Sequence, residues 1–214
     1  MSVLDRVAEF RRLLESVLET VGLELQANQL AHLARHYSLL VCWNSRINLT
    51  AIKDIEGIVE RHFGESLFVA KLMQDFEGTL ADVGSGAGFP GVPIGVSCPR
   101  LDVTLIESNA RKAAFLKEVT RSVANIRVFH GRLEDVSRTF DWATIRAVNP
   151  DRITRSLRSL ADNVAFLVSR RQATHLPDQP LWEWRDPKPL PWGRQRVLLL
   201  GKRMEETVPV PRGT

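Results

Sequence analysis

The glycine-rich segment at residues 79–91, Thr-Leu-Ala-Asp-Val-Gly-Ser-Gly-Ala-Gly-Phe-Pro-Gly, constrains the fold of this chain most strongly. Its first five residues are mostly apolar or β-branched and predict a buried strand. Gly84, Gly86 and Gly88 follow, and glycines this close together allow positive φ angles and the close approach of a ligand to the main chain. Residues 90–97 predict a short helix with prolines confined to its first turn. A strand, a glycine turn and a helix in this order predict the nucleotide-binding corner of an α/β sheet.

The spacing of the glycines indicates which nucleotide this corner binds. A dinucleotide fingerprint, G-x-G-x-x-G, would place its third glycine at position 89, where this chain has Phe89. A bulky side chain there obstructs the tight packing of strand and helix around a pyrophosphate. An adenosyl ligand without phosphate tolerates such a side chain, so the spacing favours an S-adenosylmethionine site over that of an NAD oxidoreductase.

Length and composition predict a globular protein with one domain of ordinary size. The chain has 214 residues, of which 44% are hydrophobic and 25% charged, and no apolar run approaches the roughly 20 residues of a membrane span. Charged residues near the N-terminus argue against a signal peptide, and the two cysteines, Cys42 and Cys98, cannot form a disulfide framework. We therefore expect a cytoplasmic protein without membrane association. The net charge of +4 favours a polyanionic partner.

The first 75 residues predict helices, and the sheet is expected to begin only near residue 79. Helical spacing of apolar residues covers four segments, with Asp54 as the N-cap of the third: 2–22, 26–43, 55–62 and 65–73. Further strands are expected at 102–107, 126–129, 141–146 and 164–169, with helices at 110–124 and 154–160 between them. This alternation predicts parallel strands with crossover helices. A last strand at 195–201, after a stretch rich in Trp and Pro at 177–192, suits an antiparallel hairpin at the sheet edge.

Three segments at the carboxyl ends of these strands are candidates for one ligand site. Glu107 ends the second strand about 20 residues after the glycine turn, where a carboxylate can accept from both ribose hydroxyls. The alternative is that it only starts the next helix. Leu133 and Glu134 follow the third strand, where an adenine would rest on an apolar side chain beside polar groups. Arg146 ends the fourth strand near the expected reacting methyl, with a surface salt bridge as the alternative.

The sequence lacks the residues that other classes of methyltransferase and a metal site require. Asn149-Pro150 is not followed by the Pro-aromatic pair typical of exocyclic-amine methyltransferases, and neither cysteine follows the fourth strand as a pyrimidine-carbon enzyme requires. The histidines are dispersed and no His-Glu-x-x-His occurs, so no metal site is expected. A row of arginines, Arg152, Arg155 and Arg158, is most often a solvated helix face, although it could hold phosphates.

These residues together resemble the bacterial small-subunit ribosomal RNA guanine-N7 methyltransferase family of the GidB type. The likeness covers about residues 10–203, and its most specific parts are two short N-terminal stretches that general methyltransferases lack. The segments that carry it are Trp43-Asn44-x-x-Ile47-Asn48-Leu49-Thr50, Arg61-His62 with Ser66-Leu67, 82–91, Leu105-Ile106-Glu107-Ser108, Lys112 with Phe115-Leu116, Gly131-Arg132-x-Glu134, and Arg146-Ala147-Val148.

The resemblance implies a Rossmann-like sheet of class I S-adenosylmethionine-dependent methyltransferases at 76–214 behind an N-terminal helical region at 1–75, packed as one compact domain. It implies methyl transfer from S-adenosylmethionine to a guanine N7 in the 530 loop of 16S rRNA, with the rRNA or a 30S assembly particle as the partner and no metal. Gly84, Phe89, Leu133, Glu134 and Arg146 match the family's cofactor contacts by position. Gly86 of the glycine turn and Glu107 at the end of the second strand are further cofactor-binding candidates.

The substrate side of the site is expected at Asn48, Arg61, His62 and Arg132. Two departures from the family pattern concern this side. Phe63-Gly64-Glu65-Ser66 follows the Arg-His pair where Leu-Asp-Ser is usual, and Val168-Ser169-Arg170 replaces a Lys-Gly ending of strand five, where Arg170 or Arg171 could substitute for the lysine.

Guanine N7 has a free lone pair and no proton to remove, so its methylation requires alignment and desolvation rather than a base. This agrees with the absence of an evident base in the sequence. We take Arg146 as the catalytic residue between cofactor and RNA. Two alternatives stay open, namely a methyltransferase for another RNA, protein or small molecule, and an RNA-binding module with a vestigial cofactor pocket.

Overall fold

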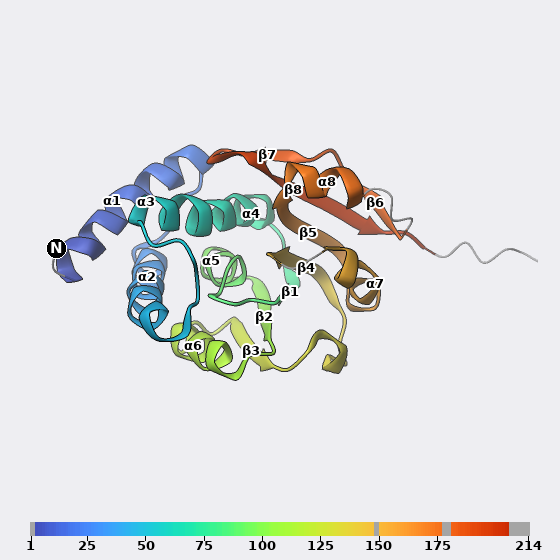
Figure 1. The fold of residues 1–214 in the computed structure, drawn as a ribbon, viewed down its shortest axis with the longest axis horizontal. Helices are drawn as coiled ribbons and strands as arrows, with labels where there is room; N and C mark the ends of the chain where they lie inside the picture. Colours follow the sequence, from blue (N-terminus) through green and yellow to red (C-terminus); the bar gives the residue numbers. More distant parts are fainter. Residues whose placement is uncertain (1–2, 148–149, 177–180, 206–214) are drawn as a thin grey trace, which may run out of the picture.

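The computed structural model describes residues 3–147, 150–176 and 181–205. Within these ranges the chain forms an eight-stranded sheet with helices on both faces (Figure 1). Asn149, with the first residues of the Trp- and Pro-rich stretch at 177–180, lies outside the described residues. None of the helices in the described ranges is long and apolar enough to cross a membrane.

Five parallel strands form the main part of the sheet. They are β1 (Gly78–Val83), β2 (Leu101–Glu107), β3 (Ile126–His130), β4 (Phe140–Arg146) and β5 (Ala161–Ser169). The spatial order β3-β2-β1-β4-β5 places β1 between β2 and β4, so the strand order reverses at β1. Ligands of open α/β sheets bind at such a reversal, outside the carboxyl ends of the strands.

The last strands complete the sheet in the opposite direction. The long strand β8 (Gly193–Arg203) pairs antiparallel with β5 on one side, and β6 (Trp182–Trp184) and β7 (Lys188–Leu190) pair antiparallel with β8 on the other. The register joins Ser169 to Arg196 at one end of the β5–β8 pair and Asn163 to Lys202 at the other. The start of β8 therefore lies at the same edge of the sheet as the carboxyl ends of the parallel strands.

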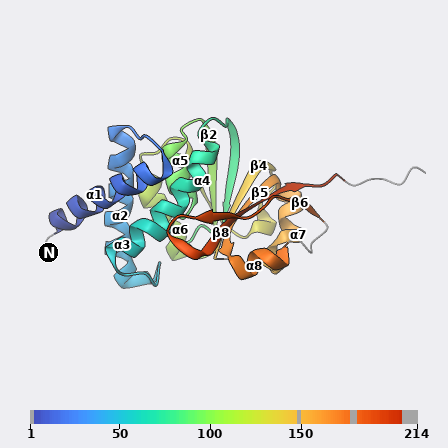
Figure 2. The ribbon, with the colours of Figure 1, turned by 90° about the horizontal axis from the view of Figure 1, so that it is seen from above.

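The helices cover the two faces unequally (Figures 1 and 2). One group of helices, which includes the N-terminal ones, lies on one side of the sheet, and a smaller group lies on the other side. On the first side the helices are α1 (Val3–Val21), α2 (Ala27–Ile47), α3 (Ile55–Ile58), the π-helix η1 (Val59–Gly64), α4 (Glu65–Met73), α5 (Gly91–Ser97) and α6 (Ala110–Thr120). The others are the 3-10 turn η2 (Leu133–Asp135), α7 (Pro150–Leu160) and α8 (Arg170–His175).

Two hydrophobic clusters hold these layers together. The larger cluster joins side chains of the N-terminal helices, such as Phe10 and Leu33, to strand residues such as Leu80 and Leu101. The smaller cluster packs α7 and α8 against the opposite face through residues such as Leu157 and Phe166. Because one cluster includes both the N-terminal helices and the sheet, the two parts are packed on each other.

The structure differs from the sequence expectation mainly around the third predicted helix. Residues 55–73 form one continuous helical stretch whose middle, η1, is a π-helix instead of a regular turn. A π-helix segment is rare and is often associated with functional sites. Smaller differences are an α2 that runs on to Ile47, an α7 that starts at Pro150 because proline suits a first helical position, and the short helix α8, which was not predicted.

Candidate active site

The glycine turn is held open at the carboxyl end of β1. Gly84, Gly86 and Gly88 all have positive φ, at 72°, 57° and 88°. The backbone N–H groups of Gly84 and Ser85 both donate to the carbonyl of Ile106 in β2, at 2.9 and 3.1 Å. These bonds tie the turn to the neighbouring strand, so that its backbone faces the crevice where the strand order reverses.

The carboxylate of Glu107 lies directly beside this turn. Its Oε2 accepts from the N–H of Gly86 at 2.8 Å, and its Oε1 accepts from the N–H of Asn109 at 2.8 Å. Both roles that the sequence suggested for Glu107 are compatible with this position. The carboxylate lies at the ligand crevice, and it also lies next to Asn109, the N-cap of α6. A carboxylate has further lone pairs beyond these two bonds and can still accept from a ligand.

A cavity of about 510 Å³ opens between the glycine turn and the N-terminal helices. Its walls come from the turn with Glu107, the loop at 49–51, η1, Lys112 of α6, the end of β4 and the start of β8. Of the residues expected at the site, Gly84, Gly86, Phe89, Glu107, Arg61, His62 and Arg146 all line it. The topology thus brings most of the predicted cofactor and substrate residues into one space.

A substitution at Gly86 can test whether the cofactor lies against the glycine turn. A Cβ at this position would meet only the carbonyl of Gly84, at 3.7 Å, so the protein leaves open space there. For Gly86→Ala we expect a stability loss of only about 1–2 kcal/mol, the cost of the left-handed conformation, but a fall in cofactor affinity of about tenfold or more because the methyl enters the cavity. Gly22, with φ of 68° and nothing within 4 Å, is the matched control.

Gly22→Ala should reproduce the stability loss without any change in affinity. Urea unfolding and titration with S-adenosylhomocysteine by calorimetry measure the two quantities. Equal affinities for wild type and Gly86→Ala would contradict the placement of the ligand against this turn.

Arg146 reaches the cavity from the end of β4 and is held at all three of its nitrogen positions. Its Nη1 donates to Nδ1 of His62 at 2.7 Å, its Nη2 donates to the carbonyl of Arg61 at 2.8 Å, and its Nε lies 3.4 Å from Oε2 of Glu65. The side chain is 10% exposed, and burial lowers its pKa to about 10, so the guanidinium remains charged at neutral pH. Arg146 is therefore a fixed cation rather than a surface salt bridge.

Glu65 holds a second arginine on the same carboxylate. Arg196 of β8 donates from Nε to Oε1 at 2.9 Å and from Nη2 to Oε2 at 2.8 Å. Glu65 is 1% exposed, and its two oxygens are shared between the guanidinium groups of Arg146 and Arg196. A buried carboxylate of this kind needs charge partners with good hydrogen-bond geometry, and both arginines supply them.

Two histidines and Phe89 form a stacked column beside this network. The Phe89 ring lies between His36 and His62, at centroid distances of 4.6 and 4.7 Å. Because Arg146 always donates, Nδ1 of His62 accepts, and Nε2 carries the proton and donates to Oγ1 of Thr50 at 2.7 Å. Burial, and next the charge of Arg146, lower the pKa of His62 to about 2. Phe89 thus separates two neutral imidazole rings.

These histidines predict a loss of stability in acid. Burial lowers the pKa of His36 to about 4, so in the fold both His36 and His62 stay neutral below pH 6.5, where an unfolded histidine takes a proton. The unfolded state then binds more protons, and the free energy of unfolding falls as pH drops from 6.5 toward 4. Asp82 opposes this in part, because burial raises its pKa to about 6 and its folded form gains a proton first.

The two histidines lower the free energy of unfolding in acid and Asp82 alone raises it, so the net effect of acid is destabilising. Urea unfolding measured from about pH 7 to about pH 5 should show a falling midpoint. Asp82→Asn removes the opposing contribution and should make the fall steeper. A midpoint that is constant over this range would contradict the neutral state of the two histidines.

Four residues expected at the site lie outside this cavity. Leu133 and Glu134 belong to η2, after β3 at the same edge of the sheet, but neither lines the cavity, and Arg132 before them is exposed. Asn48 ends α2 with φ of 50° and lines a separate hollow of about 380 Å³, which shares Thr50 with the main cavity. Asn48 therefore shapes the other side of the 49–51 loop.

The sequence analysis did not select Glu65, Arg196 or Asn44 as candidate site residues, although Asn44 belongs to a stretch that carries the family resemblance. Asn44 holds the backbone of Thr50 with its amide, accepting from the N–H at 2.8 Å and donating to the carbonyl at 3.1 Å. Arg170 and Arg171, suggested as substitutes for a lysine after β5, lie on α8 and are exposed; the cation at the end of β5 in the cavity is Arg196 from the paired strand.

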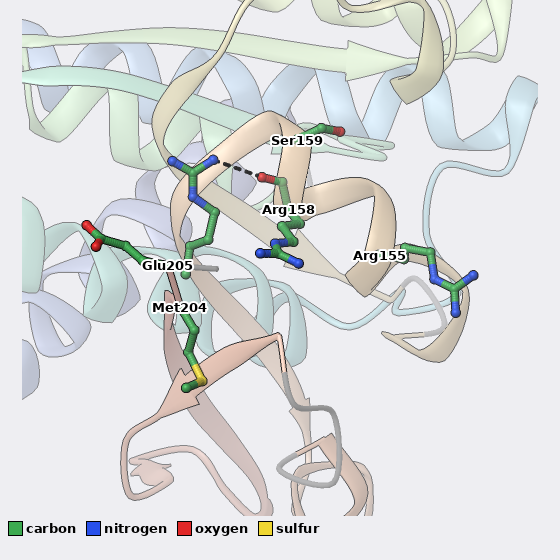
Figure 3. Close-up of a pocket in the computed structure, with 6 residues that line it drawn as sticks. Arg155, Arg158, Ser159, Met204 and Glu205 are labelled. Atoms are coloured by element: carbon green, nitrogen blue, oxygen red, sulfur yellow. Dashed lines mark hydrogen bonds between the residues drawn. The ribbon is translucent and has the colours of Figure 1, made fainter. Parts of the chain in front are cut away.

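A basic hollow of about 530 Å³ lies elsewhere, between α7 and the end of β8 (Figure 3). Arg155 and Arg158 line it with Arg203, whose Nη1 donates to the carbonyl of Arg158 at 3.1 Å. Arg203 lies at the far end of β8 from Arg196, so this hollow is at the opposite edge of the sheet from the glycine turn. In the described parts of the chain, no group of His, Cys, Asp and Glu could hold a metal ion.

Comparison with known proteins adds a family to this geometry. Residues 29–174 match the family model described as GidB, rRNA small subunit methyltransferase G. Proteins named ribosomal RNA small subunit methyltransferase G are similar to this chain: the one from Leuconostoc mesenteroides is 34% identical over 171 residues, covering 74% of this chain and 72% of the relative. The one from Chloroflexus aggregans is 39% identical over 145 residues, covering 64% of this chain and 61% of the relative, so the match spans about three fifths of that protein.

Solved structures with low sequence identity show the fold alone. A SAM-dependent methyltransferase from Aquifex aeolicus matches with a TM-score of 0.56 at 12% identity, covering 69% of this chain and 93% of the other. A ribosomal protein L11 methylase from Lactobacillus delbrueckii gives 0.56 at 14% identity, covering 68% and 79%. The predicted fold class, a Rossmann-like methyltransferase sheet with an N-terminal helical region, is confirmed.

Proposed function

The chain belongs to the rRNA small subunit methyltransferase G family, and from this membership we propose that it transfers a methyl group from S-adenosylmethionine to N7 of a guanine in the 530 loop of 16S rRNA. The observation that carries the proposal is the cavity in which the glycine turn and Glu107 face a wall of arginines. The glycine turn with Glu107 can hold an adenosyl group, and the arginines can hold RNA. We propose the cytoplasm, where ribosomal particles are found, as the compartment.

The residues around the glycine turn fit S-adenosylmethionine. The open space at Gly86 admits a ligand against the main chain, and Glu107 offers acceptor lone pairs for ribose hydroxyls. Leu133 and Glu134 follow β3 at this edge, and we assign them to the adenine. When bound, the cofactor supplies a sulfonium methyl group that the N7 lone pair attacks in line, breaking the carbon–sulfur bond and leaving its electron pair on sulfur.

The protein then has to orient the guanine rather than move a proton. The product carries the positive charge that the sulfonium loses, and no base is required because N7 has no proton. Arg146 is held by three partners between the glycine turn and η1 and can keep the RNA aligned with the methyl. Arg61 is exposed at the rim, and Arg132 is exposed after β3; both suit phosphates of the RNA. His62, which was expected on the substrate side, lines the same cavity and in this proposal holds Arg146 in position beside the RNA.

Incubating the purified protein with 30S particles that lack the modification and with S-adenosylmethionine tests this function. Nuclease digestion and mass spectrometry should then place one N7-methylguanosine in the 530 loop. Free 16S rRNA in a parallel reaction distinguishes a particle from naked RNA as the substrate. No methyl transfer to either RNA, with S-adenosylhomocysteine still bound, would redirect the proposal to another substrate; no binding of S-adenosylhomocysteine would leave an RNA-binding module.

A further inference from the structure

The side chains of η1, β4 and β8 that line the cavity present mainly hydrogen-bond donors. Arg61, Arg146 and Arg196 supply guanidinium groups there. The side-chain acceptors between them are already used, because Glu65 is shared by two arginines and both ring nitrogens of His62 have partners. A base that enters this wall must therefore offer acceptor atoms rather than amino groups.

Arg196 has an unused donor group at this wall. Its Nε and Nη2 bind Glu65, and Nη2 also lies 3.4 Å from the carbonyl of Leu167. Within the part of the chain that the structure describes, Nη1 of Arg196 has no hydrogen-bond partner. The side chain is 21% exposed and lines the cavity. Arg146, in contrast, has a contact at each nitrogen.

The orientation of this unused group is set in advance. The two parallel bonds to Glu65 hold the guanidinium plane of Arg196, and β8 holds its backbone opposite Ser169. A guanidinium locked by a carboxylate loses little further freedom when it donates to a ligand. The Arg61 side chain is exposed, and Arg61 contacts Arg146 through its backbone carbonyl, so its guanidinium is less well placed to select a base.

We infer that Arg196 determines the specificity for guanine by donating from Nη1 to O6 of the target base. This inference rests on the proposed function. Adenine and guanine both carry a lone pair at N7, so the methyl transfer alone cannot distinguish them. They differ at position 6, where guanine has an acceptor oxygen and adenine has an amino donor that would face the donor of Arg196. The adjacent N7 stays free for the methyl.

A cycle of changes in enzyme and substrate tests this assignment. Small subunits are reconstituted with 16S rRNA whose target guanine is replaced by 2-aminopurine, which keeps N7 and the 2-amino group but has hydrogen in place of O6. With wild-type enzyme, the loss of O6 should lower kcat/KM for N7 methylation on the order of 10- to 100-fold. Arg196→Gln should show a similar loss on guanine and little additional loss on 2-aminopurine.

The matched control is Arg61→Gln, which changes an arginine of the same cavity and should lower kcat/KM by the same factor on both bases. Arg196→Gln should also narrow the preference for guanine over adenine, because glutamine can accept from the amino group. Arg196→Lys, which keeps a cation beside Glu65, replaces Arg196→Gln if thermal melting shows that the latter does not fold.

Equal losses for the Arg196 variant on guanine and on 2-aminopurine would overturn the inference, as would unchanged wild-type activity without O6. Failure of the wild-type enzyme on particles with the natural guanine would instead refute the proposed function. The two failures are therefore distinguished within the same set of reactions.

Discussion

Arg146→Ala is expected to lower the rate of methyl transfer at saturating cofactor by about 100-fold or more. The reaction requires alignment of N7 with the methyl group, and small errors in position cost about this factor. The fold should survive, because Glu65 retains its two bonds to Arg196 after Arg146 is removed. We expect a stability loss of about 1–3 kcal/mol from the partners that are left without a donor.

Single-turnover methylation of 30S particles measures the rate, and thermal melting with S-adenosylhomocysteine titration checks the fold and the cofactor site. Arg146→Lys is the matched control for charge. A lysine cannot reach His62, Arg61 and Glu65 at once, so it should recover only a small part of the activity. Activity of the alanine variant near that of wild type would exclude a catalytic role for Arg146.

Glu65→Ala is expected to destabilise the fold by about 3–5 kcal/mol, the usual cost of breaking a buried ion pair. The change leaves Arg146 and Arg196, whose side chains are 10% and 21% exposed, as neighbouring cations without a counter-charge. It also raises the positive charge of the wall next to a guanine that becomes cationic on methylation. Activity should therefore fall even at temperatures where the variant is folded.

Glu77→Ala gives the comparison for Glu65→Ala. Glu77 pairs with Arg100 at the surface, where the two side chains are 66% and 53% exposed. Removing an exposed pair should cost less than about 1 kcal/mol. Urea unfolding of both variants measures the difference, and a loss for Glu65→Ala as small as that for Glu77→Ala would show that the buried network does not stabilise the fold.

The parts of the site that could be predicted from the sequence are those that local pattern determines. The glycine turn must follow β1, and Glu107 must end β2, because strands, turns and their spacing are visible in short windows. Parallel strands bring their carboxyl ends to one edge, so Glu107 and Arg146 could be placed near each other without coordinates. Both line the cavity.

The rest depends on contacts between distant residues. Glu65 and Arg196 are separated by 131 positions, and nothing in either segment alone indicates that they pair. The π-helix also has no local signature in these residues, although it determines where His62 and Arg61 face. Gly64 shows such a dependence between distant residues. A Cβ at this position would lie 2.8 Å from the ring of Trp192, so only glycine leaves room for this ring, which comes from a segment far along the chain.

The place of β8 in the sheet has a consequence for how the protein is made. Synthesis proceeds from the N-terminus, so the glycine turn, Glu107 and Arg146 are all available before Trp192 and Arg196 leave the ribosome. A nascent chain that ends after β5 would carry the expected cofactor site at the glycine turn. Glu65 would lack its two hydrogen bonds from Arg196, and one wall of the cavity would be missing. Competence for RNA would then be acquired only once β8 has been synthesised and pairs with β5.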